Sequence, residues 1–225
     1  MTQWAFLRWM DWSPSYDSHA TVTTRVCEFL GSEESVQVIK PASGSFEAGK
    51  VMLSWIADRV RLTGERQPVR IVVHPDQRQL DTIVDSGMPD DERVLVVLWS
   101  SDPAFEGWVY ARGGVNLAAD ATDQVVPDPV IVEALRGVPL NNGLGGSYGR
   151  DRLVEVLVAL HKGGYALNTP ALEAAGAAAG MDLDDLKNVR VHADRTVNGK
   201  PMRIKNPMLR PDVVTVWEES ARNRR

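Results

Sequence analysis

The segments VRIVV at residues 69–73 and RVLVVLW at residues 93–99 decide the fold class of this chain. Both are short, mainly apolar and rich in β-branched residues, which is typical of buried strands. Strands that are apolar on both faces are covered by helices on both sides, as in parallel sheets. A predicted helix at residues 76–87 separates the two segments, so together they form a strand–helix–strand unit.

The same alternation of strand and helix extends toward the N-terminus. We predict strands at residues 3–10 (QWAFLRWM) and 35–40 (SVQVIK), and helices at residues 18–30 and 46–62. These elements predict an α/β fold with a mostly parallel, Rossmann-like sheet flanked by helices. Residues 107–112 (GWVYAR) are a candidate for a fifth strand.

Proline and glycine residues separate this α/β domain, residues 1–136, from a smaller C-terminal domain at residues 150–225. The glycine-rich segment 137–149 is predicted to be a linker. Apolar and alanine-rich segments then predict three helices, at residues 150–162, 170–179 and 183–189.

The dipeptide Asn198-Gly199 follows these helices and is a strong signal for a β-hairpin turn. We therefore predict two strands around it, within residues 189–207. Three short helices followed by a hairpin is the order of a winged helix-turn-helix. The C-terminal domain therefore resembles a winged helix in its arrangement.

Composition places the chain among ordinary globular proteins. It has 225 residues, of which 44% are hydrophobic and 24% are charged. Its one cysteine, Cys27, cannot form an internal disulfide or supply a zinc cage, so we expect no metal site. With no signal peptide and no apolar stretch of about 20 residues, we expect a cytoplasmic protein without a membrane partner.

Charge is distributed unevenly along the chain. Residues 1–136 carry 12 basic and 20 acidic side chains, whereas residues 137–225 carry 13 basic and 10 acidic side chains. The basic excess is greatest around the predicted hairpin. There Arg195, Lys200, Arg203 and Lys205 are candidates for contact with nucleic acid or a protein partner.

Two observations oppose nucleic acid as that partner. Asp182, Asp184 and Asp185 lie at the start of the helix that would enter a groove, where they would repel phosphates. The overall pI of about 5.4 is also low for a dedicated DNA-binding protein. A protein partner is therefore retained as an alternative.

Polar side chains follow each of the four predicted strands. Because the carboxyl ends of parallel strands meet at one edge of the sheet, we expect these side chains to lie along that edge. They are candidates for binding a ligand there: Asp11, Lys40, Ser43, His74, Asp76, Ser100 and Asp102.

The segment Gly44–Lys50 fits the spacing G-x-x-x-x-G-K of a phosphate-binding loop, with Gly44, Gly49 and Lys50 as its matching residues. It follows a predicted strand and opens a predicted helix, as such a loop does. Val51 stands where a hydroxyl would hold magnesium, and Glu47 adds a negative charge inside the loop. A nucleotide is thus a weak candidate, and no other cofactor is indicated.

The N-terminal aromatic residues Trp4, Phe6, Trp9 and Trp12 are predicted to be buried. Their exposure would instead indicate a surface for another subunit of an assembly.

No catalytic motif is complete, and no G-x-S-x-G segment presents a nucleophilic serine. The sequence therefore leaves open whether the protein is an enzyme. It favours a non-catalytic binding or adaptor protein of the cytoplasm that docks a protein partner or nucleic acid through its C-terminal domain. The alternative is a nucleotide- or phosphate-handling enzyme that uses the carboxyl-end loops of the sheet.

Overall fold

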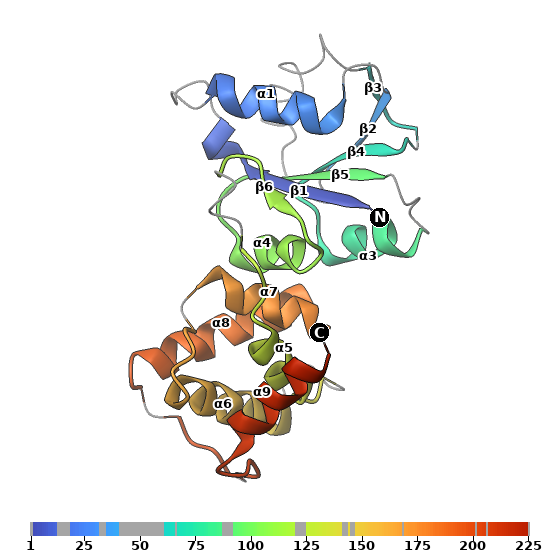
Figure 1. Cartoon of the computed structure of the whole chain (residues 1–225). Helices are drawn as coiled ribbons and strands as arrows, with labels where there is room; N and C mark the ends of the chain where they lie inside the picture. The colour runs from blue at the N-terminus through green and yellow to red at the C-terminus, as the bar shows by residue number, and fades with distance from the viewer. Residues whose placement is uncertain are drawn as a thin grey trace. The chain divides into compact units, whose positions relative to one another are not determined.

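The computed structural model divides the chain into two compact units (Figure 1), each described here by itself. The sheet unit comprises Met1–Asp102 and Gly113–Gln124, and the helical unit comprises Pro103–Arg112 and Val125–Arg225. The structure describes residues 2–12, 19–31, 35–40, 61–65, 67–86, 92–119, 125–140, 144, 147–167, 169–200, 202–205 and 207–224.

The sheet unit contains a parallel sheet with the strand order β3-β2-β4-β5-β1-β6. Every adjacent pair of strands is parallel, which confirms the predicted α/β fold with a parallel sheet. The strands are β1 (Gln3–Arg8), β2 (Ser35–Ile39), β3 (Arg61–Thr63), β4 (Val69–Val73), β5 (Arg93–Leu98) and β6 (Val115–Asn116).

Helices cover both faces of this sheet because its central strands are apolar on both faces. Helix α1 (His19–Leu30) packs Val22, Val26 and Leu30 against one face, which includes Ile71 of β4 and Leu95 of β5. Helix α3 (Gln77–Asp85) lies on the opposite side of the sheet (Figure 1). Each fully buried aliphatic side chain in such a core contributes about 1.5–3 kcal/mol to stability.

Of the four N-terminal aromatic residues, Trp4, Phe6 and Trp12 are buried, as predicted, whereas Trp9 is only partly buried. The side chains of Trp4, Phe6 and Trp12 are 5%, 0% and 0% exposed. Trp12 ends a 3-10 helix, η1 (Trp9–Trp12), and its indole Nε1 donates a hydrogen bond of 2.8 Å to Thr23 of α1. These residues therefore anchor the first loop of the sheet unit to α1.

The predicted fifth strand at residues 107–112 is wrong, because α4 (Pro103–Tyr110) occupies this position. Residues Ala104–Tyr110 are all buried, including Glu106, so the segment lacks the exposed polar face that marks a surface helix. The edge strands β3 and β6, which are three and two residues long, were not predicted. The predicted helix at residues 46–62 lies mostly outside the described residues, and its last two residues belong to β3.

The helical unit is built from α4 and five later helices. These are α5 (Pro129–Arg136), α6 (Ser147–Lys162), α7 (Pro170–Ala178), α8 (Leu183–Val197) and α9 (Val213–Asn223). Although α4 lies between β5 and β6 in the sequence, it belongs to this unit and packs against α7. The predicted linker at residues 137–149 stays a prediction, because residues 141–143 and 145–146 are outside the described residues.

The predicted hairpin around Asn198-Gly199 is wrong. Helix α8 continues to Val197, with Leu186, Val189 and Ala193 buried at helical spacing. A strand would bury Val189 and Val191 on the same face, but Val191 is 55% exposed.

Gly199 ends this helix rather than turning a hairpin. Its φ is 62°, and the N–H groups of Gly199 and Lys200 donate to the carbonyls of Thr196 and Arg195. This is the Schellman pattern of a helix C-terminus. Without the hairpin, the described residues do not complete a winged helix.

A close approach of α4 to α7 depends on Gly107. A Cβ atom at this position would lie 2.4 Å from Cβ of Glu173 and 2.6 Å from its main-chain carbonyl carbon. The carbonyl carbon belongs to the α7 main chain and cannot move aside as a flexible side chain can. The two helices can therefore pack this closely only where one of them has no side chain.

We predict that Gly107→Ala destabilises the protein by about 1–3 kcal/mol, the cost of forcing a methyl group into a filled core. In a helix without this close contact, replacing glycine by alanine would instead stabilise the protein by about 1 kcal/mol. Thermal unfolding followed by circular dichroism measures the difference. Gly64→Ala is the control, because a Cβ atom there meets nothing within 4 Å. A Tm for Gly107→Ala at or above that of the wild type contradicts the prediction.

Candidate functional site

The carboxyl edge of the sheet carries the candidate residues that lie within the described part of the chain. Lys40 follows β2, His74 follows β4, Ser100 follows β5 and Asp11 lies in η1 after β1. The parallel register places all four strand ends at the same edge. Ser43, Gly44, Gly49 and Lys50 lie outside the described residues, so the phosphate-loop hypothesis stays a prediction.

Asp76 has a structural role at this edge. Its carboxylate accepts a hydrogen bond of 2.8 Å from the N–H of Gln79, and the Gln79 side chain returns a bond to the N–H of Asp76. This capping box starts α3. The Gln79 amide also donates a hydrogen bond of 2.8 Å to the Lys40 carbonyl, so α3 holds the end of β2 beside the end of β4.

His74 has the most unusual conformation at this edge. Its φ is 43°, a left-handed value that only glycine adopts without strain. Its N–H donates a hydrogen bond of 2.7 Å to the carbonyl of Val97, and its ring lies 5.9 Å from the ring of Trp99. Strain of this kind often marks a functional position. Of the other candidates, Asp11 lies 3.8 Å from Arg8, and Asp102 directly precedes α4.

Sequence reasoning missed a cavity of about 320 Å³ beside α3. Gln37 and Ile39 of β2, Arg70 of β4, and Gln79 and Thr82 of α3 line it. Arg70 is buried in an ion pair with Glu92, which is fully buried. The signal for this cavity was the presence of Gln37 and Arg70 at inward-facing positions of apolar strands.

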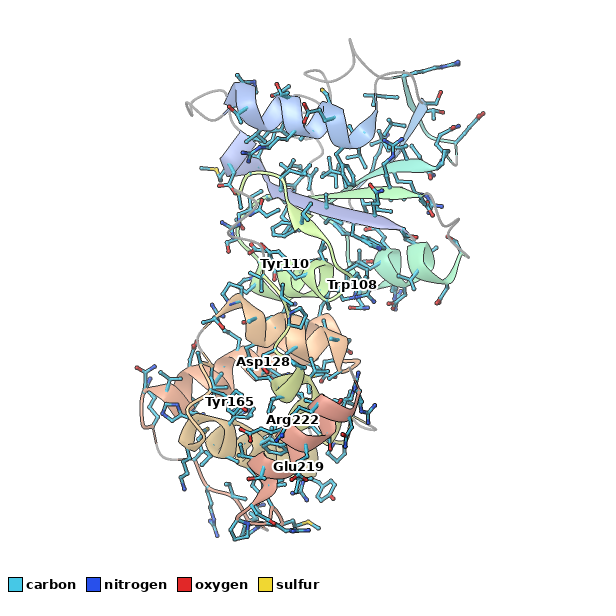
Figure 2. The ribbon with its side chains drawn as sticks, viewed as in Figure 1. Trp108, Tyr110, Asp128, Tyr165, Glu219 and Arg222 are labelled. Carbon is cyan, nitrogen blue, oxygen red and sulfur yellow. The ribbon has the colours of Figure 1, made fainter. Side chains whose placement is uncertain are left out.

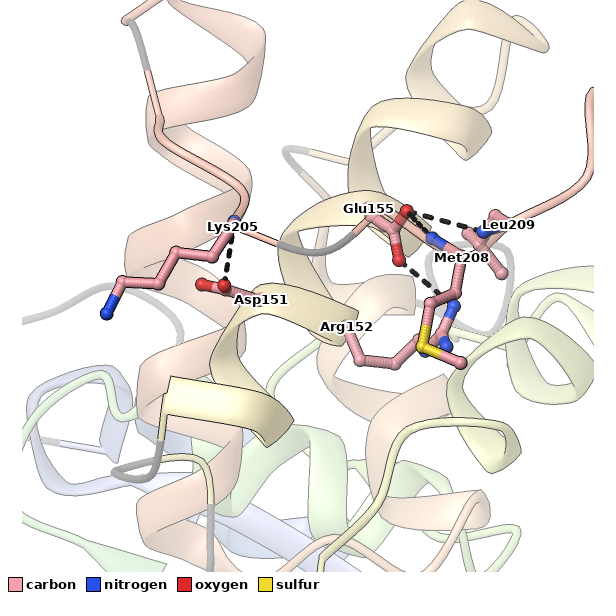
Figure 3. A network of polar contacts seen from close by, with 6 residues as sticks. All are labelled: Asp151, Arg152, Glu155, Lys205, Met208 and Leu209. Atoms are coloured by element: carbon pink, nitrogen blue, oxygen red, sulfur yellow. Dashed lines mark hydrogen bonds and ion pairs between the residues drawn. The ribbon is translucent and has the colours of Figure 1, made fainter.

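The residues after α8 run along α6 in the helical unit, where they are held by two buried carboxylates (Figure 3). Asp151 accepts a hydrogen bond of 3.0 Å from the main-chain N–H of Lys205. Glu155 accepts bonds of 2.6 Å from the N–H of Met208 and 3.3 Å from that of Leu209. Arg152 lies 3.0 Å from the other oxygen of Glu155.

This attachment uses the main chain and leaves the basic side chains exposed. Lys200, Arg203 and Lys205 are all exposed, and the Lys205 side chain points away from Asp151 in Figure 3. Arg195 is half-buried in the last turn of α8. Residues 195–205, hereafter the basic segment, contain four basic side chains and no acidic one.

The acidic residues that opposed nucleic acid lie at the far end of α8. Asp182 caps the helix by accepting a bond of 2.7 Å from the N–H of Asp185, and Asp184 pairs with Lys187. Asp185 accepts a bond of 3.1 Å from the N–H of Leu144, and burial raises the pKa of its carboxyl. Asp182 and Arg195 are 13 positions apart, which corresponds to roughly 20 Å at 1.5 Å per residue, about twice the Debye length at 0.1 M salt.

A tyrosine contact ties α9 to the end of α6. Tyr165, labelled in Figure 2, donates a hydrogen bond of 2.9 Å from its hydroxyl to Glu218 of α9. Burial and the carboxylate of Glu218 raise the pKa of Tyr165 to about 12. The hydroxyl therefore stays protonated and serves as a structural donor.

A buried ion pair joins α7 to α8. Arg190 lies 2.6 Å from Glu173, whose side chain is fully buried. Burial raises the pKa of the Glu173 carboxyl above its ordinary value, although the positive charge of Arg190 acts in the opposite direction. The cost of removing the carboxylate from water is thus only partly offset by its partner.

We predict that Glu173→Gln raises the stability of the protein at neutral pH. The amide keeps the shape and can still accept a bond from Arg190, but it carries no buried charge. Because the folded-state pKa is raised, the wild type loses stability as pH rises through that value, and the variant does not. Urea unfolding between pH 4 and 8 should show a difference that grows with pH.

The exposed Glu219, labelled in Figure 2, supplies the control Glu219→Gln, which should change stability little at any pH. A Glu173→Gln variant that is less stable than the wild type at neutral pH would show that the pair with Arg190 outweighs burial.

Within the residues that the structure describes, no group of His, Cys, Asp and Glu side chains is arranged to hold a metal ion. The same residues include no helix that is long and apolar enough to cross a membrane.

Comparison with known proteins bears on the helical unit alone. Residues 127–218 match a family model described as a domain of unknown function, DUF1889. The match extends from just before α5 into α9 and includes none of the strands. Neither a curated protein nor a solved structure matches the chain.

Proposed function

We propose that this chain is a non-catalytic binding protein of the cytoplasm whose helical unit docks nucleic acid. The observation that carries the proposal is the basic segment, in which Lys200, Arg203 and Lys205 are exposed while main-chain bonds attach Lys200 to α8 and Lys205 to α6. Attachment of the main chain at two points reduces the conformational entropy that the segment loses when its cations contact phosphates, which favours binding.

The position of the acidic residues supports the same proposal. The capping and paired aspartates at the start of α8 lie roughly 20 Å from the basic segment. The low overall pI results mainly from residues 1–136, which carry the acidic excess. The local charge of the binding surface, and not the average over the chain, determines the attraction of a polyanion.

Reversing the three exposed charges tests this function. We predict that Lys200→Glu, Arg203→Glu and Lys205→Glu together reduce the affinity for a fluorescent single-stranded or duplex oligonucleotide by about tenfold or more at low salt. The slope of log affinity against log salt should fall by about 2–3, since each phosphate contact contributes about 0.7–0.9. Fluorescence anisotropy measures both quantities.

A control variant carries the same change in net charge at exposed positions elsewhere: Arg61→Glu, Arg78→Glu and Lys187→Glu. It should bind nearly as the wild type does. An equal loss of oligonucleotide affinity in both triple variants would indicate a non-specific charge effect and contradict the proposal. A wild type that binds no nucleic acid but captures a protein, with capture lost in the basic-segment variant, would make that protein the partner.

The alternative function, a nucleotide- or phosphate-handling enzyme, is favoured by one observation in the sheet unit. His74 is held at a strained φ beside Trp99 at the carboxyl edge, where Rossmann-like sheets bind ligands. Its imidazole and the neighbouring indole would offer a donor and a stacking surface to a nucleotide.

We predict under this alternative that a nucleotide from a panel of ATP, GTP and related compounds, with and without magnesium, raises the Tm of the wild type. At about 100 times its Kd the ligand would stabilise the fold by about 2.7 kcal/mol. His74→Gly removes the ring while glycine accepts the same φ, so the variant should fold but lose the shift. No shift with any nucleotide would count against the alternative.

A further inference from the structure

A cluster of three basic side chains lies between α6 and α8. His192 is a residue of α8 and is 8% exposed, Arg195 lies one turn later on the same helix, and Arg150 lies in the first turn of α6. Helix α6 packs against α8, and the charges of Arg150 and Arg195 both act on the imidazole of His192. We refer to Arg150, His192 and Arg195 as the cationic cluster.

Two buried polar atoms of this cluster lack hydrogen-bond partners in the described part of the chain. They are Nδ1 of His192 and Nε of Arg195. A buried polar atom without a partner costs about 1–3 kcal/mol, so native structures rarely retain one without a reason. Binding of an external group that accepts hydrogen bonds would remove this cost.

Two acidic residues, Asp151 and Asp194, are adjacent to these arginines in the sequence, and neither forms an ion pair with them among the described residues. Asp151, next to Arg150 in the sequence, accepts the main-chain N–H of Lys205. Asp194, next to Arg195, is exposed, and its negative charge contributes to the raised pKa of the Glu173 carboxyl on α7. Among the described residues, neither Arg150 nor Arg195 forms an ion pair, so the cluster keeps its positive charge.

We propose that Arg150, His192 and Arg195 bind one phosphate group. A phosphate offers several acceptor oxygens, and a guanidinium presents paired donors that match them. Lys205 is bonded through its main chain to the residue after Arg150, so the basic segment leads to the cluster. A nucleic-acid strand on the basic segment would therefore have one backbone phosphate within reach of the cluster, and this source of the phosphate rests on the proposed function.

The first experiment uses inorganic phosphate and the full-length protein. Isothermal titration at low ionic strength should show binding to the wild type, and Arg195→Gln and Arg150→Gln should each weaken it by roughly tenfold or more. Lys187→Gln removes one exposed positive charge from the same helix and is the control, with an expected change of less than about twofold.

The imidazole of His192 gives a second measurement that needs no variant. In the free protein, burial and then the charges of Arg150 and Arg195 lower the pKa of His192. Phosphate between these groups should raise the pKa again, because an anion favours the protonated imidazole. NMR titration of the His192 ring protons with and without phosphate measures the change. An unmoved His192 signal, together with no heat of binding, overturns the proposal.

An oligonucleotide arm identifies the source of the phosphate. If Arg195→Gln lowers the affinity for both inorganic phosphate and single-stranded DNA, the cluster binds a backbone phosphate. If the variant no longer binds inorganic phosphate but binds DNA as the wild type does, the phosphate site is supported, and its ligand is free phosphate or a small phosphorylated molecule. If DNA does not bind at all while phosphate does, the proposed function fails and the phosphate site stands.

Discussion

The carboxylates of Asp151 and Glu155 accept main-chain N–H groups from Lys205, Met208 and Leu209, and the surface of the helical unit depends on these bonds. Residues 202–205 and 207–210 form no helix or strand, so regular secondary structure supplies no acceptors for their N–H groups. Two acids one turn apart on α6 accept three of these groups, those of Lys205, Met208 and Leu209. Because the acids bind the main chain, they fix the path of the segment without pairing with its basic side chains.

Stability and binding place different demands on the charges of this unit. Glu173 and Arg190 neutralise each other across α7 and α8, with the carboxylate buried and the arginine side chain 34% exposed. In the cationic cluster, by contrast, burial and then the charges of Arg150 and Arg195 lower the pKa of His192, which lowers the stability of the fold at low pH. A cost of this kind is expected where a protein keeps positive charge available for a ligand.

The sequence was informative where one local pattern has a single structural meaning. The apolar runs at residues 69–73 and 93–99 predicted buried parallel strands correctly, because few other structures bury both faces of a short segment. Residues 107–112 were misleading because a fully buried helix is as apolar as a buried strand. Asn198-Gly199 was misleading because glycine at positive φ both turns a hairpin and ends a helix.

The candidate site was less predictable than the fold, since it depends on contacts between distant residues. Asp76 was a plausible ligand-binding residue from its place after a strand, but its carboxylate is used by the capping box of α3. The exposed cations at positions 200, 203 and 205 were identified from charge alone, although the hairpin expected to carry them is absent from the described residues. Arg150 lies 45 positions before Arg195, and only the packing of α6 on α8 brings the two together near His192.

The two units therefore differ in how their polar groups are used. At the sheet edge, Asp76 and Gln79 are already bonded to the main chain of α3 and β2, which leaves His74 with its strained backbone as the most unusual feature. In the helical unit Asp151 and Glu155 accept main-chain N–H groups, and the side chains of Lys200, Arg203 and Lys205 remain exposed. The proposed binding function uses these exposed cations and needs no reactive group, whereas the alternative function rests on His74 at the sheet edge.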